Sequence, residues 1–131
     1  MSGSTVSVHD KDFQIYITEQ EILNKVQSLG QRLAHDYQKK EPLFLAVLNG
    51  AFMFASDLMK AVEIPAEISF IKVASYQGME SEGRTKELLG LNVDIKGRHV
   101  LVVEDIVDSG LTMEGIIKNL KEKGAASIEV V

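Results

Sequence analysis

The sequence predicts a single α/β domain built on a sheet of mainly parallel strands. Short continuous apolar runs, which are typical of strands buried on both faces of a parallel sheet, recur along the chain. Between them lie longer segments whose apolar residues repeat at helical spacing. The chain has 131 residues, of which 45% are apolar and 25% are charged. This length and balance fit one domain, residues 1–131, with one ordinary core.

The first half of the chain is predicted to hold two helices and two strands. Residues 1–12 are expected to form a loose start. Thr18 stands three residues before Glu21, which is the capping-box pattern, so a helix is expected from there to about Lys40. Pro42 ends it. The strand, helix and strand that follow are expected at residues 43–48, 51–62 and 66–74.

The second half opens with a long polar segment, residues 75–86, which contains glycine and has no apolar periodicity. A loop of this length inside a compact domain is usually functional. The remaining elements are expected to be two strands, a loop, a helix and a final strand, at residues 87–93, 99–103, 104–112, 112–123 and 127–131. Gly124 fits the position that follows a helix. Because the chain stops inside an apolar strand, the C-terminal part of the domain is expected to be missing.

Charge and composition exclude several classes of function. A net charge of −5 disfavours sequence-independent binding of nucleic acid. No apolar run approaches the roughly 20 residues that span a bilayer, and the N-terminus lacks a signal core, so a cytoplasmic enzyme without membrane contact is expected. The absence of cysteine excludes disulfides, thiolate catalysis and cysteine-ligated zinc.

A phosphate site is predicted where residues 99–112, HVLVVEDIVDSGLT, lead from a buried strand into a helix. Such a strand delivers its loop to the carboxyl edge of the sheet, where open α/β folds bind ligands. A small turn at a helix N-terminus presents several backbone N–H groups to a phosphate. Gly110 allows close approach, and Ser109 and Thr112 can donate hydroxyl groups.

Two acids, Glu104 and Asp105, stand just before this turn. They would repel a bare phosphate. They are useful if they hold a sugar diol or a Mg²⁺ ion beside it. The loop is therefore predicted to bind a phosphate that is attached to a ribose.

The string of four apolar residues, two acids, two apolar residues and Asp-Ser-Gly-x-Thr resembles the signature of the type I phosphoribosyltransferases, which binds 5-phosphoribosyl-1-diphosphate (PRPP). Leu48-Asn49-Gly50 resembles the diphosphate-binding loop of their hypoxanthine-guanine branch, and Ser75-Tyr76 resembles the start of its flexible catalytic loop. The likeness runs from about Ile15 to the last residue. It implies the type I phosphoribosyltransferase fold and Mg²⁺-dependent purine salvage, in which PRPP and hypoxanthine, guanine or xanthine give the nucleotide and diphosphate.

The resemblance also implies a role for each site residue. Glu104 and Asp105 would hold the ribose hydroxyl groups, directly or through Mg²⁺. Asp108 would act as general base, or hydrogen-bond acceptor, at the purine N7, and Ile106 would pack against the purine ring. The 5′-phosphate would be bound by Asp108, Ser109, Gly110, Leu111 and Thr112. The diphosphate would be bound by backbone N–H groups of the Leu48, Asn49 and Gly50 loop, with a cis peptide between Leu48 and Asn49, while Ser75 and Tyr76 would close over the reacting centre.

Some features depart from the family pattern or leave alternatives open. Asn49 stands where lysine is more usual, and Leu111 occupies a variable position that is often lysine. The base-reading residues of relatives would lie beyond Val131, so base specificity rests on the resemblance. The alternatives are a pyrimidine phosphoribosyltransferase, an RNA-binding attenuation regulator on the same fold, an inert truncated domain, and a Mg²⁺-binding receiver-type domain. A homodimer or homotetramer is expected by resemblance.

Overall fold

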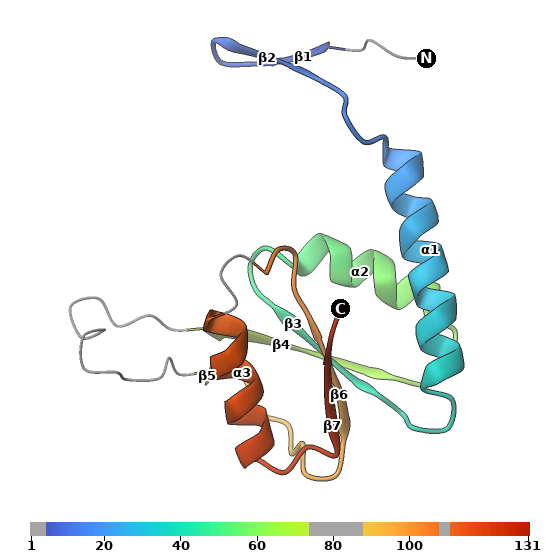
Figure 1. Cartoon of the computed structure of the whole chain (residues 1–131), viewed down its shortest axis with the longest axis vertical. Coiled ribbons are helices and arrows are strands. Elements are labelled where there is room, and N and C mark those ends of the chain that lie inside the picture. The colour runs from blue at the N-terminus through green and yellow to red at the C-terminus, as the bar shows by residue number, and fades with distance from the viewer. Residues whose placement is uncertain (1–4, 74–87, 108–110) are drawn as a thin grey trace, which may run out of the picture.

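A five-stranded sheet forms the centre of the protein, for which the computed structural model describes residues 5–73, 88–107 and 111–131 (Figure 1). The strand order is β5-β4-β3-β6-β7. Strands β3, β4, β6 and β7 run parallel, and β5 pairs antiparallel with β4. The strands span Leu43–Val47 (β3), Glu67–Val73 (β4), Leu88–Leu89 (β5), His99–Val103 (β6) and Ser127–Val130 (β7). The predicted fold class, a mainly parallel α/β sheet, is confirmed.

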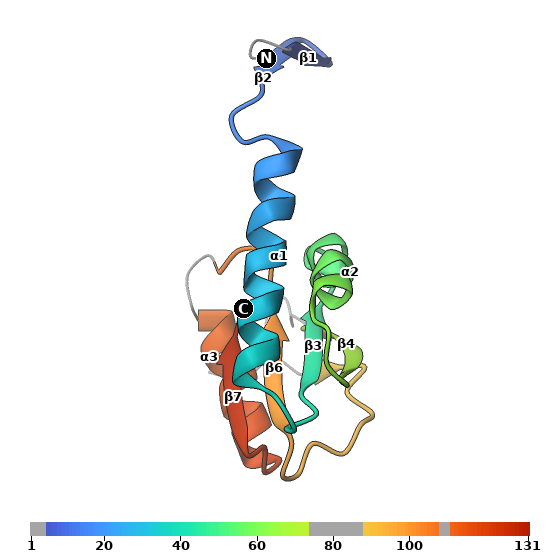
Figure 2. The same ribbon diagram turned by 90° about the vertical axis from the view of Figure 1, so that its right-hand side faces the viewer.

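Three helices cover the two faces of this sheet (Figure 2). Helices α1 (Glu19–Asp36) and α2 (Phe52–Ala61) pack against one face, and α3 (Leu111–Glu122) packs against the other. Alternate residues of β3 enter the two cores: Phe44 joins the α1–α2 side and Leu45 joins the α3 side. All five β3 residues are buried, which explains why the strand is a continuous apolar run rather than an alternating one.

Most predicted boundaries agree with the structure to within one or two residues, and β6 agrees fully. The first helix is an exception, because it ends at Asp36 rather than near Lys40. Strand β5 is another, because only two residues of the predicted 87–93 strand form a ladder. The chain turns away at Gly90, whose φ is +89°, and Leu91 and Val93 pack into the core as irregular chain. Their apolar character therefore reflects burial and not a longer strand.

The prediction of a loose start was wrong for residues 5–12. Strands β1 (Thr5–Val8) and β2 (Lys11–Gln14) pair as an antiparallel hairpin beyond the far end of α1 (Figure 1). Val6 faces Phe13 across the ladder, and Ser7 Oγ donates to Asp12 Oδ1 at 2.5 Å. The signal in the sequence was the alternation of apolar and polar residues, which is the pattern of a strand with one polar face.

The predicted capping box at the start of α1 is present. The Glu21 N–H donates to Thr18 Oγ1 at 3.1 Å, and the Thr18 N–H donates to Glu21 Oε1 at 3.1 Å. These bonds satisfy two backbone donors. The bonds that the Glu21 carboxylate accepts from the Thr18 N–H and the Thr18 hydroxyl lower the pKa of Glu21.

Replacing Thr18 by alanine should lower the free energy of unfolding by about 1 kcal/mol, because it removes the N-cap acceptor. Thr18→Ser is the matched control, since serine keeps an oxygen at the same position and should retain most of the stability. Urea denaturation followed by circular dichroism measures both. Equal stability of the alanine and serine variants would show that the cap contributes nothing.

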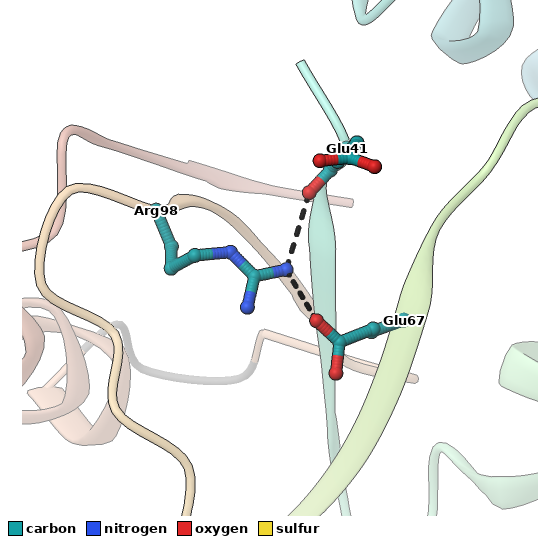
Figure 3. Close-up of polar contacts among 3 residues, drawn as sticks. All are labelled: Glu41, Glu67 and Arg98. Carbon is teal, nitrogen blue, oxygen red and sulfur yellow. Dashed lines mark hydrogen bonds and ion pairs between the residues drawn. The ribbon is translucent and has the colours of Figure 1, made fainter. Parts of the chain in front are cut away.

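A polar cluster ties the amino ends of three adjacent strands together (Figure 3). Arg98, just before β6, donates through Nη2 to the backbone oxygen of Glu41 at 3.2 Å and lies 2.8 Å from Glu67 Oε1. Glu41 precedes β3, and Glu67 begins β4. The cluster therefore fixes the edge of the sheet opposite to the one where the predicted site residues lie.

Candidate functional site

Two described segments of the predicted site, residues 48–50 and 104–106, lie at the carboxyl edge of two neighbouring strands. Strands β3 and β6 are parallel, with Ala46 paired to Val103. The chain leaving β3 as Leu48-Asn49-Gly50 and the chain leaving β6 as Glu104-Asp105-Ile106 therefore emerge side by side. Parallel pairing alone brings together segments that are more than fifty residues apart in sequence.

The two segments are in close contact through Gly50 and Asp105. A Cβ atom on Gly50 would lie 2.7 Å from Cγ and 2.9 Å from Oδ1 of Asp105, so the Asp105 side chain would have to move. The Asp105 carboxylate thus occupies the space that any other residue at position 50 would fill. Its Oδ1 also accepts a hydrogen bond of 2.8 Å from the Ile106 N–H. Sequence reasoning gave these residues separate roles and missed this contact.

The neighbouring acids have different electrostatic surroundings. The Asp105 N–H donates to Glu104 Oε1 at 3.1 Å. Burial, followed by the Asp105 carboxyl group, raises the pKa of Glu104. Hydrogen bonding with the Glu104 carboxyl group and with the Ile106 N–H lowers the pKa of Asp105. Asp105 is consequently the more acidic group of the pair, because its pKa is lowered while that of Glu104 is raised.

The loop after β3 has the features of an anion site. Its Leu48–Asn49 peptide is cis, as the resemblance implied. Leu48 and Ala51 donate their N–H groups to the backbone oxygens of Ile71 and Val47, at 2.8 and 3.1 Å. In the described part of the chain, the exposed N–H groups of Asn49 and Gly50 have no protein acceptor. As far as the described residues are concerned, both could therefore donate to a ligand.

Helix α2 begins immediately after these amides. Its N-cap residue, Ala51, provides no side-chain cap, and its first turn contains no acid. The first N–H groups of a helix lack internal partners, and the helix dipole adds partial positive charge there. This helix start therefore reinforces the attraction of Asn49 and Gly50 for a negatively charged group.

An exposed apolar surface follows the acids. Ile106 is 71% exposed and Val107 is 51% exposed, although they lie only a few residues after the buried end of β6. Ile106 is thus placed where a flat apolar ring can lie against it. Leu111 and Thr112 belong to the first turn of α3. The other predicted residues lie outside the described residues, namely Ser75, Tyr76, Asp108, Ser109 and Gly110.

A cavity of about 580 Å³ lies elsewhere, between α1 and strands β6 and β7. Its lining carries charges of both signs, including Arg32, Lys40 and Glu129, and contains none of the predicted site residues.

Over residues 5–73, 88–107 and 111–131, no cluster of three or more His, Asp or Glu side chains could hold a metal ion. No helix in those ranges is long and apolar enough to cross a membrane. A cation at Glu104 and Asp105 would therefore need further oxygen ligands, such as water or substrate phosphate.

A protein-family model described as the phosphoribosyl transferase domain matches residues 14–131. The chain is 38% identical over 130 residues to the bifunctional protein TilS/HprT of Listeria monocytogenes, covering 98% of this chain and 20% of that protein. It is also 38% identical over 124 residues to the hypoxanthine-guanine phosphoribosyltransferase of Bacillus subtilis, covering 94% of this chain and 68% of the relative.

Solved structures of hypoxanthine phosphoribosyltransferases are also similar to this chain in fold and sequence. A hypoxanthine phosphoribosyltransferase from Staphylococcus aureus superposes with a TM-score of 0.81 at 34% identity, over 90% of this chain and 65% of that one. A mutant hypoxanthine phosphoribosyltransferase from Trypanosoma cruzi, solved as a ternary complex with substrates, superposes with a TM-score of 0.78 at 37% identity, over 88% and 68%. The chain therefore spans a fifth of the bifunctional relative and about two thirds of these single-function ones.

Proposed function

The chain belongs to the phosphoribosyl transferase domain family, and from this premise we propose that it carries out purine salvage. The reaction transfers the 5-phosphoribosyl group of PRPP to hypoxanthine, guanine or xanthine and releases diphosphate. One observation carries the proposal: unpaired amides suited to an anion and a carboxylate suited to a sugar diol meet at Gly50 and Asp105. PRPP presents a diphosphate and two ribose hydroxyl groups on adjacent carbons, so it matches this pairing.

The same contact supports a Mg²⁺ ion. A diphosphate bound by the Asn49 and Gly50 amides would lie beside the Asp105 carboxylate, and the two negative groups would repel each other. Mg²⁺ typically binds one or two carboxylates together with substrate phosphates, so Glu104 and Asp105 fit it. When bound, it would neutralise charge on the departing diphosphate.

Different residues are proposed to bind different parts of the two substrates. The Asn49 and Gly50 amides bind the diphosphate, and Glu104 and Asp105 hold the ribose, directly or through the metal. The C1–O bond to diphosphate breaks while the base nitrogen approaches, so the ribose gains positive charge that the neighbouring acids stabilise. Ile106 supports the purine ring, and Asp108 accepts its N7 proton. The 5′-phosphate is held by residues 108–112, and closure of Ser75 and Tyr76 excludes water that would hydrolyse PRPP.

Substrate specificity is tested by supplying PRPP and Mg²⁺ with one base at a time: hypoxanthine, guanine, xanthine, adenine or uracil. We expect nucleotide from the 6-oxopurines only. Nucleotide from uracil alone would move the assignment to pyrimidine salvage. Saturable PRPP binding without turnover on any base would favour an inert truncated domain.

Size-exclusion chromatography at low protein concentration tests the proposed homodimer or homotetramer. The net charge of −5 disfavours the RNA-regulator alternative, because RNA binding needs a basic face.

A further inference from the structure

We propose that Gly50 is a positioning residue for Asp105, in addition to any bond that its own N–H makes with diphosphate. The absence of a side chain at position 50 allows the Asp105 carboxylate to turn toward the ribose and metal site. This inference rests on the proposed function and adds a specific role to a residue that would otherwise contribute only its backbone. The evidence is the contact between the loops after β3 and β6.

The first step is the steric clash between a side chain at position 50 and Asp105. A Cβ on Gly50 would come within 2.7 Å of Asp105 Cγ and 2.9 Å of Oδ1, so both ends of the carboxyl group are affected. The carboxylate cannot simply rotate about its last bond to escape, because its central carbon is itself too close. Asp105 would have to adopt another rotamer.

The second step concerns the interactions that a new rotamer of Asp105 would break. The carboxylate is held by the hydrogen bond from the Ile106 N–H to Oδ1, at 2.8 Å. A different rotamer loses this bond and leaves the Ile106 amide without its acceptor. The carboxylate also leaves the space beside the Asn49 and Gly50 amides. Metal and ribose would then lose a ligand even though every backbone N–H of the diphosphate loop is still present.

The two possible roles of Gly50 can therefore be separated by Gly50→Ala, since alanine keeps the N–H and adds only the Cβ. We expect this variant to bind PRPP with Mg²⁺ about 10- to 100-fold more weakly in calorimetry, the range for loss of one hydrogen bond to a charged group. Asp105→Ala should weaken binding to a similar extent. The double variant should bind no more weakly than Asp105→Ala alone, because the added methyl group then has no carboxylate to displace.

Thermal unfolding without ligand gives a second, independent measure. Gly50→Ala should lower the melting temperature in the unaltered protein and not in the Asp105→Ala background. The matched control is Gly115→Ala in α3, where an added Cβ meets no atom within 4 Å and PRPP affinity should stay unchanged.

Unchanged PRPP affinity in Gly50→Ala, or effects of the two substitutions that multiply in the double variant, would overturn the inference. Failure of the unaltered protein to bind PRPP with Mg²⁺ would instead count against the proposed function. In that case the ligand-free melting temperatures would still decide whether Gly50 and Asp105 are coupled.

Discussion

The Asp108→Asn variant is expected to turn over hypoxanthine about 10²–10⁴ times more slowly than the unaltered protein, while its PRPP affinity changes only a few-fold. Asparagine has nearly the size of aspartate and can still hydrogen-bond to neighbouring groups. It cannot accept the proton that leaves N7 as the base becomes bonded to the ribose. The loss should therefore fall on the chemical step and not on binding of the phosphorylated substrate.

Initial rates and calorimetric PRPP titrations on the same preparation separate these two effects. Asp57→Asn is a suitable control, because Asp57 lies in α2, is partly exposed and forms an ion pair with Lys60 at 3.9 Å. It makes the same change of charge away from the site and should leave both quantities intact. Normal turnover by Asp108→Asn would remove Asp108 from the role of base.

The Gly30→Ala variant should lower the free energy of unfolding by about 1–3 kcal/mol, the usual cost of overpacking a well-filled contact. Gly30 lies in the middle of α1, where glycine is a poor helix former. A Cβ there would come within 2.5 Å of Ala61 Cβ and 2.7 Å of the Ala61 backbone oxygen in α2. The backbone of α2 would have to move, so the gain in helix propensity is outweighed.

Gly115→Ala makes the same substitution with the opposite expected sign. Gly115 is also within a helix, but an added Cβ meets nothing within 4 Å. Alanine should therefore stabilise the protein by about 0.5–1 kcal/mol through helix propensity alone. Denaturant titration of both variants checks the pair. If Gly30→Ala were as stable as Gly115→Ala, the close packing of α1 on α2 would not constrain position 30.

The sheet was predictable because most of its strands coincide with short apolar runs in the sequence. The run from His99 to Val103 is apolar on both faces and begins and ends where the strand does. The capping box of Thr18 and Glu21 was equally local. By contrast, Leu91 and Val93 were predicted to belong to a strand because they are apolar, but they pack against the core without forming a ladder.

The site was predictable as a set of residues but not as an arrangement. The spacing from Glu104 to Thr112 indicates a phosphate turn preceded by acids, and it does so within one segment. The closeness of Gly50 and Asp105 depends on which strands are neighbours, which no local pattern states. Similarly, no local pattern states that the N–H groups of Asn49 and Gly50 have no acceptor among the described residues while those of Leu48 and Ala51 are bonded.

Arg98 binds the backbone oxygen of Glu41 and the carboxylate of Glu67 at the amino ends of the strands (Figure 3), and the acids and the amide loop follow the carboxyl ends. This polar cluster and the proposed ligand-binding residues therefore lie at opposite edges of the same sheet. An engineer could redesign the recognition loops for a different acceptor base and leave this anchoring rim untouched. Changes in these loops would leave the interactions at the opposite edge of the sheet in place.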